Sequence, residues 1–175
     1  FLSNRFDNLT LNDIPSFNYN LRYKDKGEVT VFEDRIFILS DYYDTQFVLV
    51  YNMSGQLVAV SNKEMYDCQR GINSIAVLGS YLFMSCTEVG IYQISIPNNN
   101  IVYLYDWKDG MKNLWRLGMT AVGDTLWVDT NDGVAQIDPN VHKLIFYREE
   151  LGYEAEGGHQ YNADIYSDGE NEVWA

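Results

Sequence analysis

Cysteine, histidine and long apolar runs are all scarce in this chain. Its two cysteines, Cys68 and Cys86, exclude a dense disulfide framework, although a single bridge between them stays open. If Cys86 is unbridged, we expect a small buried apolar residue, because it lies in an apolar strand pattern. No apolar run reaches the roughly 18 residues of a membrane span, and no stretch is rich enough in Ala, Leu, Glu and Lys to favour long helices.

Recognisable catalytic motifs are also missing. There is no Gly-x-Ser-x-Gly elbow and no phosphate-binding loop ending in Gly-Lys-Ser/Thr. The two histidines, His142 and His159, are far apart and lack His-Glu-x-x-His spacing. We therefore predict no catalytic residue, no metal ligand and no cofactor in this segment.

Basic residues are few compared with acidic ones. The chain has 12 Lys and Arg against 25 Asp and Glu, which gives a formal net charge of -13. A field of that sign repels nucleic acid and anionic lipid surfaces, so neither is an expected partner. Four acidic side chains gather in one stretch: Glu149, Glu150, Glu154 and Glu156. Paired carboxylates can hydrolyse glycosides, but we favour a solvated loop because no strand end holds them.

Aromatic and apolar residues, by contrast, are abundant. Hydrophobic residues make up 46% of the chain and aromatic residues 15%, including 14 Tyr. The apolar content excludes a disordered chain, and aromatic side chains favour pleated, half-buried surfaces. The composition therefore favours a β-rich globular fold.

One phrase of the sequence occurs twice. LFMSCTEVGIYQISIP, residues 82–97, is followed by LWVDTNDGVAQIDP, residues 126–139. Gly123 follows Gly79 by 44 positions, and Gly133 follows Gly90 by 43 positions. Short strands flank each phrase, so a unit holds four strands in about 43 residues, the period of a propeller blade. We predict an all-β fold, a β-propeller or propeller segment of four-stranded antiparallel blades.

The predicted blades cover most of the chain as a single propeller segment. Three full blades are expected at 29–71, 72–116 and 117–160, and the first two strands of another at 161–175. Residues 1–28 form an N-terminal tail, in which residues 16–23 alternate like the outer strand of a preceding blade. The N-terminal strand could complete the last blade and close a four-bladed ring. We favour instead a piece of a larger ring, because residues 172–175 break off within a strand.

A candidate binding face follows from blade topology. The turns between second and third strands, and the connections between blades, share one face, and in this sequence they are the longer set. Aromatic rings beside amides and charged groups can stack on a sugar and hydrogen-bond it, although single aromatic residues more often pack blade against blade. The predicted ligand-binding residues are Tyr42, Tyr43, Asp44, Trp107, Trp115, Arg116, Asn131, Asp132, His159 and Gln160. Trp127 and Trp174 lie within strands and are expected to pack.

The stretch from Asp129 to Gly133 could suggest a calcium loop. An EF-hand needs Gly at its sixth position and Glu at its twelfth. Counted from Asp129, Gly133 is fifth and Asn140 is twelfth, so the match fails. The stretch is better explained as a turn between strands, since Asn, Asp and Gly tolerate left-handed backbone.

The residues from Leu126 to Val134, followed by Ile137-Asp138-Pro139, resemble a known blade signature. The two-component regulator propeller repeat runs roughly Leu-Trp-Ile-Gly-Thr, two residues, Gly-Leu, then aromatic-Asp-Pro. The resemblance covers about residues 29–175. Asp129 stands in place of the usual Gly, and Phe83 in place of the usual Trp. The first blade also lacks the Thr-x-x-Gly turn.

The resemblance implies the periplasmic sensor region of a membrane histidine kinase, often a hybrid one, in bacteria that sense glycans. The leading hypothesis is therefore a non-enzymatic, periplasmic or extracellular propeller module that recognises a ligand such as an oligosaccharide. Its partners would be that ligand, the remaining blades of the parent chain and a second copy in a homodimer. A scaffold for protein–protein contacts is the alternative, and a glycan hydrolase or lyase is a third hypothesis.

Overall fold

A computed structural model describes most of the chain from residue 29 to residue 147, and two short strands beyond it. The described residues are 29–42, 45–62, 67–68, 70–111, 114, 117–130, 133–147, 166–167 and 173–174. The chain divides into two compact units, Phe1–Asn62 and Lys63–Ala175. The described part is all-β apart from one 3-10 turn, as the composition predicts.

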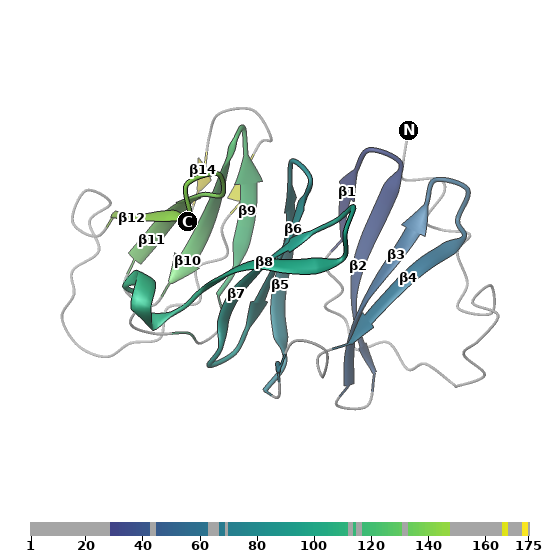
Figure 1. The fold of residues 1–175 in the computed structure, drawn as a ribbon, viewed down its shortest axis with the longest axis horizontal. Coiled ribbons are helices and arrows are strands. Elements are labelled where there is room, and N and C mark those ends of the chain that lie inside the picture. Colours follow the sequence, from purple (N-terminus) through teal and green to yellow (C-terminus); the bar gives the residue numbers. More distant parts are fainter. Residues whose placement is uncertain are drawn as a thin grey trace. The chain divides into compact units, whose positions relative to one another are not determined.

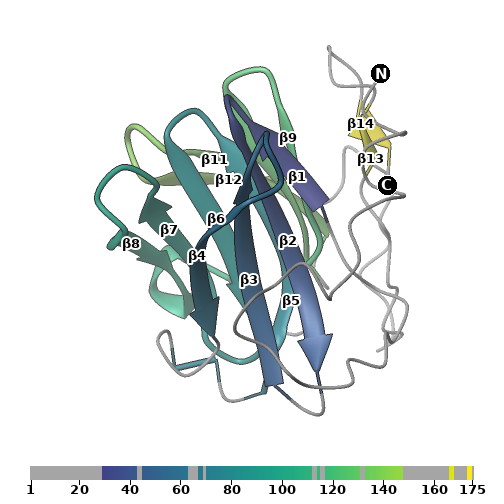
Figure 2. The ribbon, with the colours of Figure 1, turned by 90° about the vertical axis from the view of Figure 1, so that its right-hand side faces the viewer.

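The described residues of the first unit form an antiparallel sheet, the first blade, in which every strand pairs with the next along the chain (Figure 2). Its strands are β1 (Val29–Phe32), β2 (Arg35–Tyr42), β3 (Thr45–Asn52) and β4 (Leu57–Asn62). The carboxamide oxygen of Asn52 accepts hydrogen bonds from the backbone N–H groups of Ser54 and Gln56 at 3.1 and 2.9 Å. This Asx turn, with Gly55 at a φ of 81°, reverses the chain between β3 and β4.

Both faces of the first blade bury apolar side chains. Ile36, Leu49 and Tyr51 form one cluster. Phe37 and Val48, which alternate with them along the central strands, are also buried. Central strands that are apolar on both faces are typical of a sheet covered on both sides.

The described residues of the second unit form two more four-stranded antiparallel sheets and a hairpin (Figure 1). The second blade consists of β5 (Ile72–Leu78), β6 (Tyr81–Cys86), β7 (Gly90–Ser95) and β8 (Asn100–Tyr105). The third blade consists of β9 (Met119–Val122), β10 (Thr125–Thr130), β11 (Gly133–Asp138) and β12 (Lys143–Tyr147). The hairpin pairs β13 (Tyr166–Ser167) with β14 (Val173–Trp174). Three sheets of four consecutive antiparallel strands confirm the predicted fold class.

The backbone repeats where the sequence repeats. Gly79 and Gly123, which open the turns after β5 and β9, have φ values of 55° and 56°. Gly90 and Gly133, which open β7 and β11, have φ values of 130° and 119°. Glycine is required at Gly90 for a second reason, because a Cβ atom there would overlap the carbonyl oxygen of Tyr105. The two blades therefore match in the backbone conformation of their turns as well as in their sequences.

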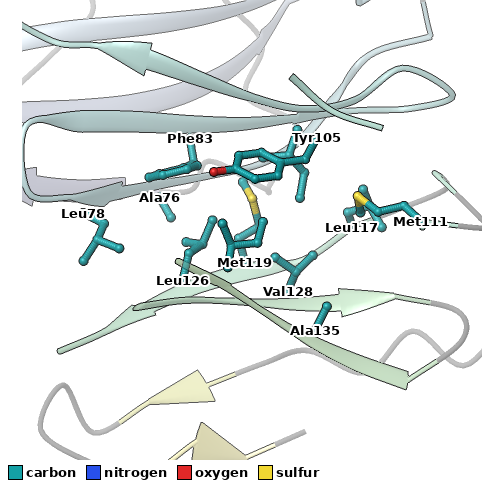
Figure 3. Packing of buried hydrophobic residues seen from close by; sticks show 12 residues of the cluster. Ala76, Leu78, Phe83, Tyr105, Met111, Leu117, Met119, Leu126, Val128 and Ala135 are labelled. Carbon is teal, nitrogen blue, oxygen red and sulfur yellow. The ribbon is translucent and has the colours of Figure 1, made fainter. Parts of the chain in front are cut away.

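The second and third blades pack face to face within this unit. Twelve buried residues form their common core, including Phe83 and Tyr105 from one blade and Leu126 and Val128 from the other. Figure 3 shows these side chains between the two sheets, with the Tyr105 ring lying over Met119. A four-stranded sheet cannot bury its own faces, so this interface supplies much of the stability of both blades.

Buried hydroxyl groups join the same two blades. The Ser85 hydroxyl donates to the carbonyl oxygen of Leu117 at 2.8 Å. The backbone N–H of Met119 donates to the Ser74 hydroxyl oxygen at 3.2 Å. Both serines are buried, so these bonds satisfy polar groups that water cannot reach.

A disulfide ties the entrance of the second blade to its second strand. Cys68 and Cys86 are bonded, with a Cα–Cα distance of 5.2 Å, and both are fully buried. This settles the question that the sequence left open. Beside the bridge, Arg70 Nε lies 2.6 Å from Glu88 Oε2 in an exposed ion pair. The disulfide closes a short loop and so restricts the unfolded chain.

One detail of the loops differs from expectation. Tyr42 was predicted on the face formed by turns and connections, yet it lies within β2, which continues to Tyr42 and pairs there with Thr45. The strand continues because Asp41 and Tyr42 gain ladder hydrogen bonds with β3. The turns between second and third strands are thus short, and the longer segments are the connections between blades.

Candidate functional site

Of the ten predicted ligand-binding residues, the structure fully describes Trp107. Tyr42 is the last residue of β2, and its side chain lies outside the described part. The other eight predicted residues, together with the acidic stretch at 149–156, lie outside the described residues: Tyr43, Asp44, Trp115, Arg116, Asn131, Asp132, His159 and Gln160. The candidate site is therefore built on Trp107 and its surroundings.

Trp107 begins a 3-10 turn, η3 (Trp107–Asp109), in the connection between the second and third blades. Asp106 caps this turn by accepting a hydrogen bond from the backbone N–H of Lys108 at 2.7 Å. The backbone N–H of Asp106 in turn donates to Asp109 Oδ2 at 3.0 Å, which completes a capping box. Gly110 ends the turn in a left-handed conformation, with a φ of 96°. Local hydrogen bonds thus fix the backbone that carries Trp107.

The Trp107 side chain faces solvent. It is 68% exposed, the highest value among the large apolar residues whose burial the structure describes. The Lys108 ammonium nitrogen lies 5.4 Å from the centre of the indole and 3.8 Å from Asp106 Oδ2. Trp107 therefore does not pack between blades, which is the more common role of an aromatic residue at a blade junction. An exposed indole beside a lysine and a carboxylate can stack on a ring and hydrogen-bond its substituents.

The second oxygen of Asp109 anchors the turn to Tyr103 of the second blade, and the Tyr103 ring contacts the third blade. The Tyr103 hydroxyl on β8 donates to Asp109 Oδ1 at 2.8 Å. The Tyr103 ring stacks on the imidazole of His142, with ring centres 4.3 Å apart and planes 5° from parallel. His142 belongs to the turn between β11 and β12 of the third blade. The hydrogen bond to Asp109 is the main reason that the pKa of Tyr103 is raised above its ordinary value.

Next to these contacts, a buried network of hydrogen bonds crosses between the two blades. The Tyr105 hydroxyl donates to Gln93 Oε1 at 2.9 Å and lies 3.4 Å from His142 Nδ1. Gln93 Nε2 donates to the carbonyl oxygen of Pro139 in the third blade at 3.3 Å. Burial, more than nearby charge, raises the pKa of Tyr105 above its ordinary value of 10.0.

Sequence reasoning missed this chain of contacts. The sequence assigned His142 no role beyond the lack of a zinc motif, and the structure places it half-buried with its ring stacked on Tyr103. A usable signal existed, because Gln93 and Gln136 are polar residues at equivalent positions of otherwise apolar strands. A tyrosine follows each of them on the next strand, Tyr105 and Tyr147.

Neither a metal cluster nor a spanning helix is found in the part of the chain that is described. Within it, no group of three or more His, Cys, Asp and Glu side chains could hold an ion. Likewise, none of the described residues forms a helix with the length and apolar character that a bilayer span requires.

Comparisons with known proteins support the fold. No protein-family model matches the sequence, and no curated protein matches it. Among solved structures, the extracellular domain assigned to a one-component system of B. thetaiotaomicron is similar to 86% of this chain, at 13% identity and a TM-score of 0.53. The match covers 19% of that protein.

Two weaker similarities are to BamB of Moraxella catarrhalis and to a europium-containing methanol dehydrogenase. BamB matches 68% of this chain and 34% of its own, at 16% identity and a TM-score of 0.48. The dehydrogenase matches 67% of this chain and 23% of its own, at 13% identity and a TM-score of 0.43. This chain spans about a third of BamB and less of the other two proteins. The fold, together with the similarity to the extracellular domain, defines the chain as a segment of a β-propeller.

Proposed function

We propose that this chain is a non-enzymatic, ligand-sensing part of a propeller receptor outside the cytoplasm. The observation that carries the proposal is Trp107, which is 68% exposed on a turn whose backbone is fixed by a capping box. A rigid turn presents the indole at little cost in conformational entropy when a ligand stacks on it. The ligand class that fits an exposed indole beside polar groups is an oligosaccharide.

Two further observations support a sensor in this compartment. The buried Cys68–Cys86 disulfide favours an oxidising environment, such as the periplasm or the cell exterior. The resemblance of residues 126–139 to the two-component regulator propeller repeat agrees with the structural similarity to an extracellular domain of a one-component system. The named repeat family remains part of the proposal.

The contacts around Trp107 offer a route by which binding could be transmitted. Asp109 shares the 3-10 turn with Trp107 and accepts the Tyr103 hydrogen bond. Tyr103 stacks on His142 of the next blade. A ligand that shifts the turn would therefore move a contact between two blades, which is how we propose that binding is communicated to the rest of a receptor.

The experiment is a glycan array followed by calorimetric titration of the glycans that bind. Trp107→Ala is expected to weaken binding by about tenfold or more, because it removes a stacking surface. It should leave the thermal midpoint unchanged, since the side chain is mostly exposed. Val58→Ala is the matched control, because Val58 is also exposed (52%) and apolar but lies on β4 of the other unit.

Two results would overturn this proposal. One is a wild-type chain that binds no glycan on the array. The other is a Trp107→Ala variant that binds a glycan as tightly as the wild-type protein and the Val58→Ala control.

A protein-binding scaffold is the second candidate, and one observation favours it. Ile101 and Val102 on β8 are 45% and 40% exposed, so the edge strand beside the Trp107 turn is apolar. Exposed apolar patches often mark protein interfaces. Under this alternative, Trp107→Ala weakens capture of a protein partner or of a second copy, and every glycan titration is silent.

A further inference from the structure

His142 lies at the contact between the second and third blades. It belongs to the turn between β11 and β12 and has a φ of 52°, in the left-handed region, where histidine is more frequent than most other residues. Its imidazole stacks on the Tyr103 ring of β8, with ring centres 4.3 Å apart and planes 5° from parallel. One of the contacts that join these two blades therefore involves a type of side chain whose charge changes between about pH 5 and 8.

The proton positions of this contact follow from its hydrogen bonds. The Tyr105 hydroxyl donates to Gln93 Oε1 at 2.9 Å and lies 3.4 Å from His142 Nδ1. Since the single hydroxyl proton is given to Gln93, the Tyr105 oxygen can only accept from His142, and Nδ1 carries a proton in both charge states. Protonation therefore takes place at Nε2, and it leaves the contact with Tyr105 in place.

Tyr103 presents a ring that favours a cation. Its hydroxyl donates to the Asp109 carboxylate at 2.8 Å, and this hydrogen bond raises the electron density of the ring. The face of a tyrosine ring attracts a cation that lies within about 6 Å of the ring centre, and the imidazole centre lies 4.3 Å away. The charged imidazole is thus held more strongly on Tyr103 than the neutral one.

Three carboxylates surround the two tyrosines that His142 touches. Their charges are among the causes that raise the pKa of Tyr103, after its hydrogen bond to Asp109, and the pKa of Tyr105, after burial. The three carboxylates are Asp106, Asp109 and Asp138. Negative charge near the stack favours the charged imidazole.

Two ammonium groups oppose these carboxylates, but each is offset by one of them. Lys108 Nζ lies 3.8 Å from Asp106 Oδ2, and Lys143 lies opposite Asp138 in the register of β11 and β12. Tyr81, the other ionisable group near Tyr105, is a phenol, and phenols are neutral between about pH 5 and 8. Asp109 is then left to act on the imidazole, in the same direction as the Tyr103 ring.

We propose that His142 forms a pH-sensitive contact between the second and third blades, which tightens when the imidazole gains a proton at Nε2. The unfolded chain has no such stack, so the stabilisation is complete on the acid side of the range in which histidine titrates and is lost as the pH rises toward about 8. Tyr103 also holds Asp109 of the Trp107 turn, so acid fixes this turn more firmly as well. The contact joins two blades of this chain and does not depend on the proposed ligand.

Thermal denaturation of the wild-type chain and of His142→Phe, at about pH 5 and about pH 8, tests the proposal. Phenylalanine keeps an aromatic ring against Tyr103 but cannot gain a proton. The cost of placing it in a left-handed backbone is the same at both pH values, and the titration of carboxylates and of His159 is common to both proteins. The wild-type midpoint should therefore exceed that of the variant by roughly 2 °C more at the lower pH than at the higher.

A Tyr103→Leu background shows whether the stack is responsible. It keeps His142 but removes the aromatic face, so His142→Phe should then change the midpoint by the same amount at both pH values. Proton NMR of the wild-type chain gives a readout that requires no variant to fold. The ring resonances of Tyr103 should shift together with those of His142 across the same pH range.

Four results would overturn the proposal. The first is a midpoint difference between wild type and His142→Phe that is the same at both pH values. The second is a larger difference at the higher pH, which would mean that the neutral imidazole makes the stronger contact. The third is a pH-dependent difference that persists in the Tyr103→Leu background. The fourth is a Tyr103 ring whose resonances do not respond when His142 titrates.

Discussion

Phe83 and Trp127 occupy the same position in two consecutive blades, yet solvent reaches only one of them. Phe83 is fully buried between the second and third blades, and Trp127 is partly exposed on the far side of the third. The tyrosine–glutamine hydrogen bond is repeated at 2.9 Å in both blades. Strands, turns and that hydrogen bond are therefore properties of one blade, whereas burial is a property of a pair of blades.

The second blade also has a covalent tie that the third lacks. Cys86 stands at the end of β6 and is bonded to Cys68, whereas Thr130 ends the equivalent strand β10. The Thr130 hydroxyl donates to the carbonyl oxygen of Gly133 at 2.7 Å, so a hydrogen bond closes that end of the third blade. We therefore expect the second blade to be the more stable of the two.

The largest effect is expected from Phe83→Ala. Loss of a fully buried phenyl ring should reduce the free energy of unfolding of the second unit by about 3–5 kcal/mol, because it leaves a cavity between two blades. Trp127→Ala, at the equivalent but partly exposed position, should cost less than half as much in the same segment. Urea denaturation of both variants measures the difference, and equal losses would remove the contrast between the blades.

Reduction of the disulfide is expected to have the next largest effect. Cys68 and Cys86 are 18 residues apart, and opening a loop of that length lowers the free energy of unfolding by about 3 kcal/mol. Urea denaturation with and without a reductant measures the loss. The double variant Cys68→Ala, Cys86→Ala is the control and should not respond to reductant. An unchanged wild-type midpoint, with both thiols shown to be free by mass spectrometry, would contradict the prediction.

The smallest effect concerns pH. Burial raises the pKa of Tyr105 above 10.0, so the unfolded chain releases this proton at a lower pH than the folded protein does. Neutral Tyr105 therefore contributes its full share to the free energy of unfolding below about pH 10. That share falls as the pH rises, by about 1.4 kcal/mol per pH unit for one proton. Tyr105→Phe should lose stability less steeply between pH 10 and 11. Denaturation midpoints across this range test it, and identical slopes would exclude the role of Tyr105.

Most of the fold could be predicted because its signals are local. The phrase that surrounds Gly79 and Gly90 recurs around Gly123 and Gly133, and each glycine marks a backbone angle that other residues rarely adopt. Alternation of apolar residues then places the strands to within a few residues. The placement of Tyr42 in a loop was wrong, because pairing with β3 extends β2 to that residue.

The contacts between blades could not be predicted in the same way. The bond from Gln93 to Pro139 joins residues 46 positions apart, and nothing near either residue specifies the other. The disulfide was undecided for a related reason, since two cysteines permit a bridge without requiring one.

The candidate site was predicted only as a face of the molecule. Blade topology placed Trp107 among the connections between blades, but its exposure depends on the capping box of Asp106 and Asp109. The sequence does not announce that turn, because the usual capping-box pattern has Glu or Gln three residues after the cap, and Asp109 stands at that position. The roles of the eight predicted residues outside the described part, and of the Tyr42 side chain, remain predictions.

The central claim is that two blades of similar sequence differ in stability because different neighbours cover them. Amide hydrogen exchange of the central strands tests this claim most directly. Strands β6 and β7 are covered by the third blade and closed by the disulfide, whereas Trp127 on β10 and Gln136 on β11 are partly exposed. In residues 1–175, peptides from 81–95 should exchange at least tenfold more slowly than the equivalent peptides from 125–138. Equal exchange rates in the two sets of peptides would contradict the account.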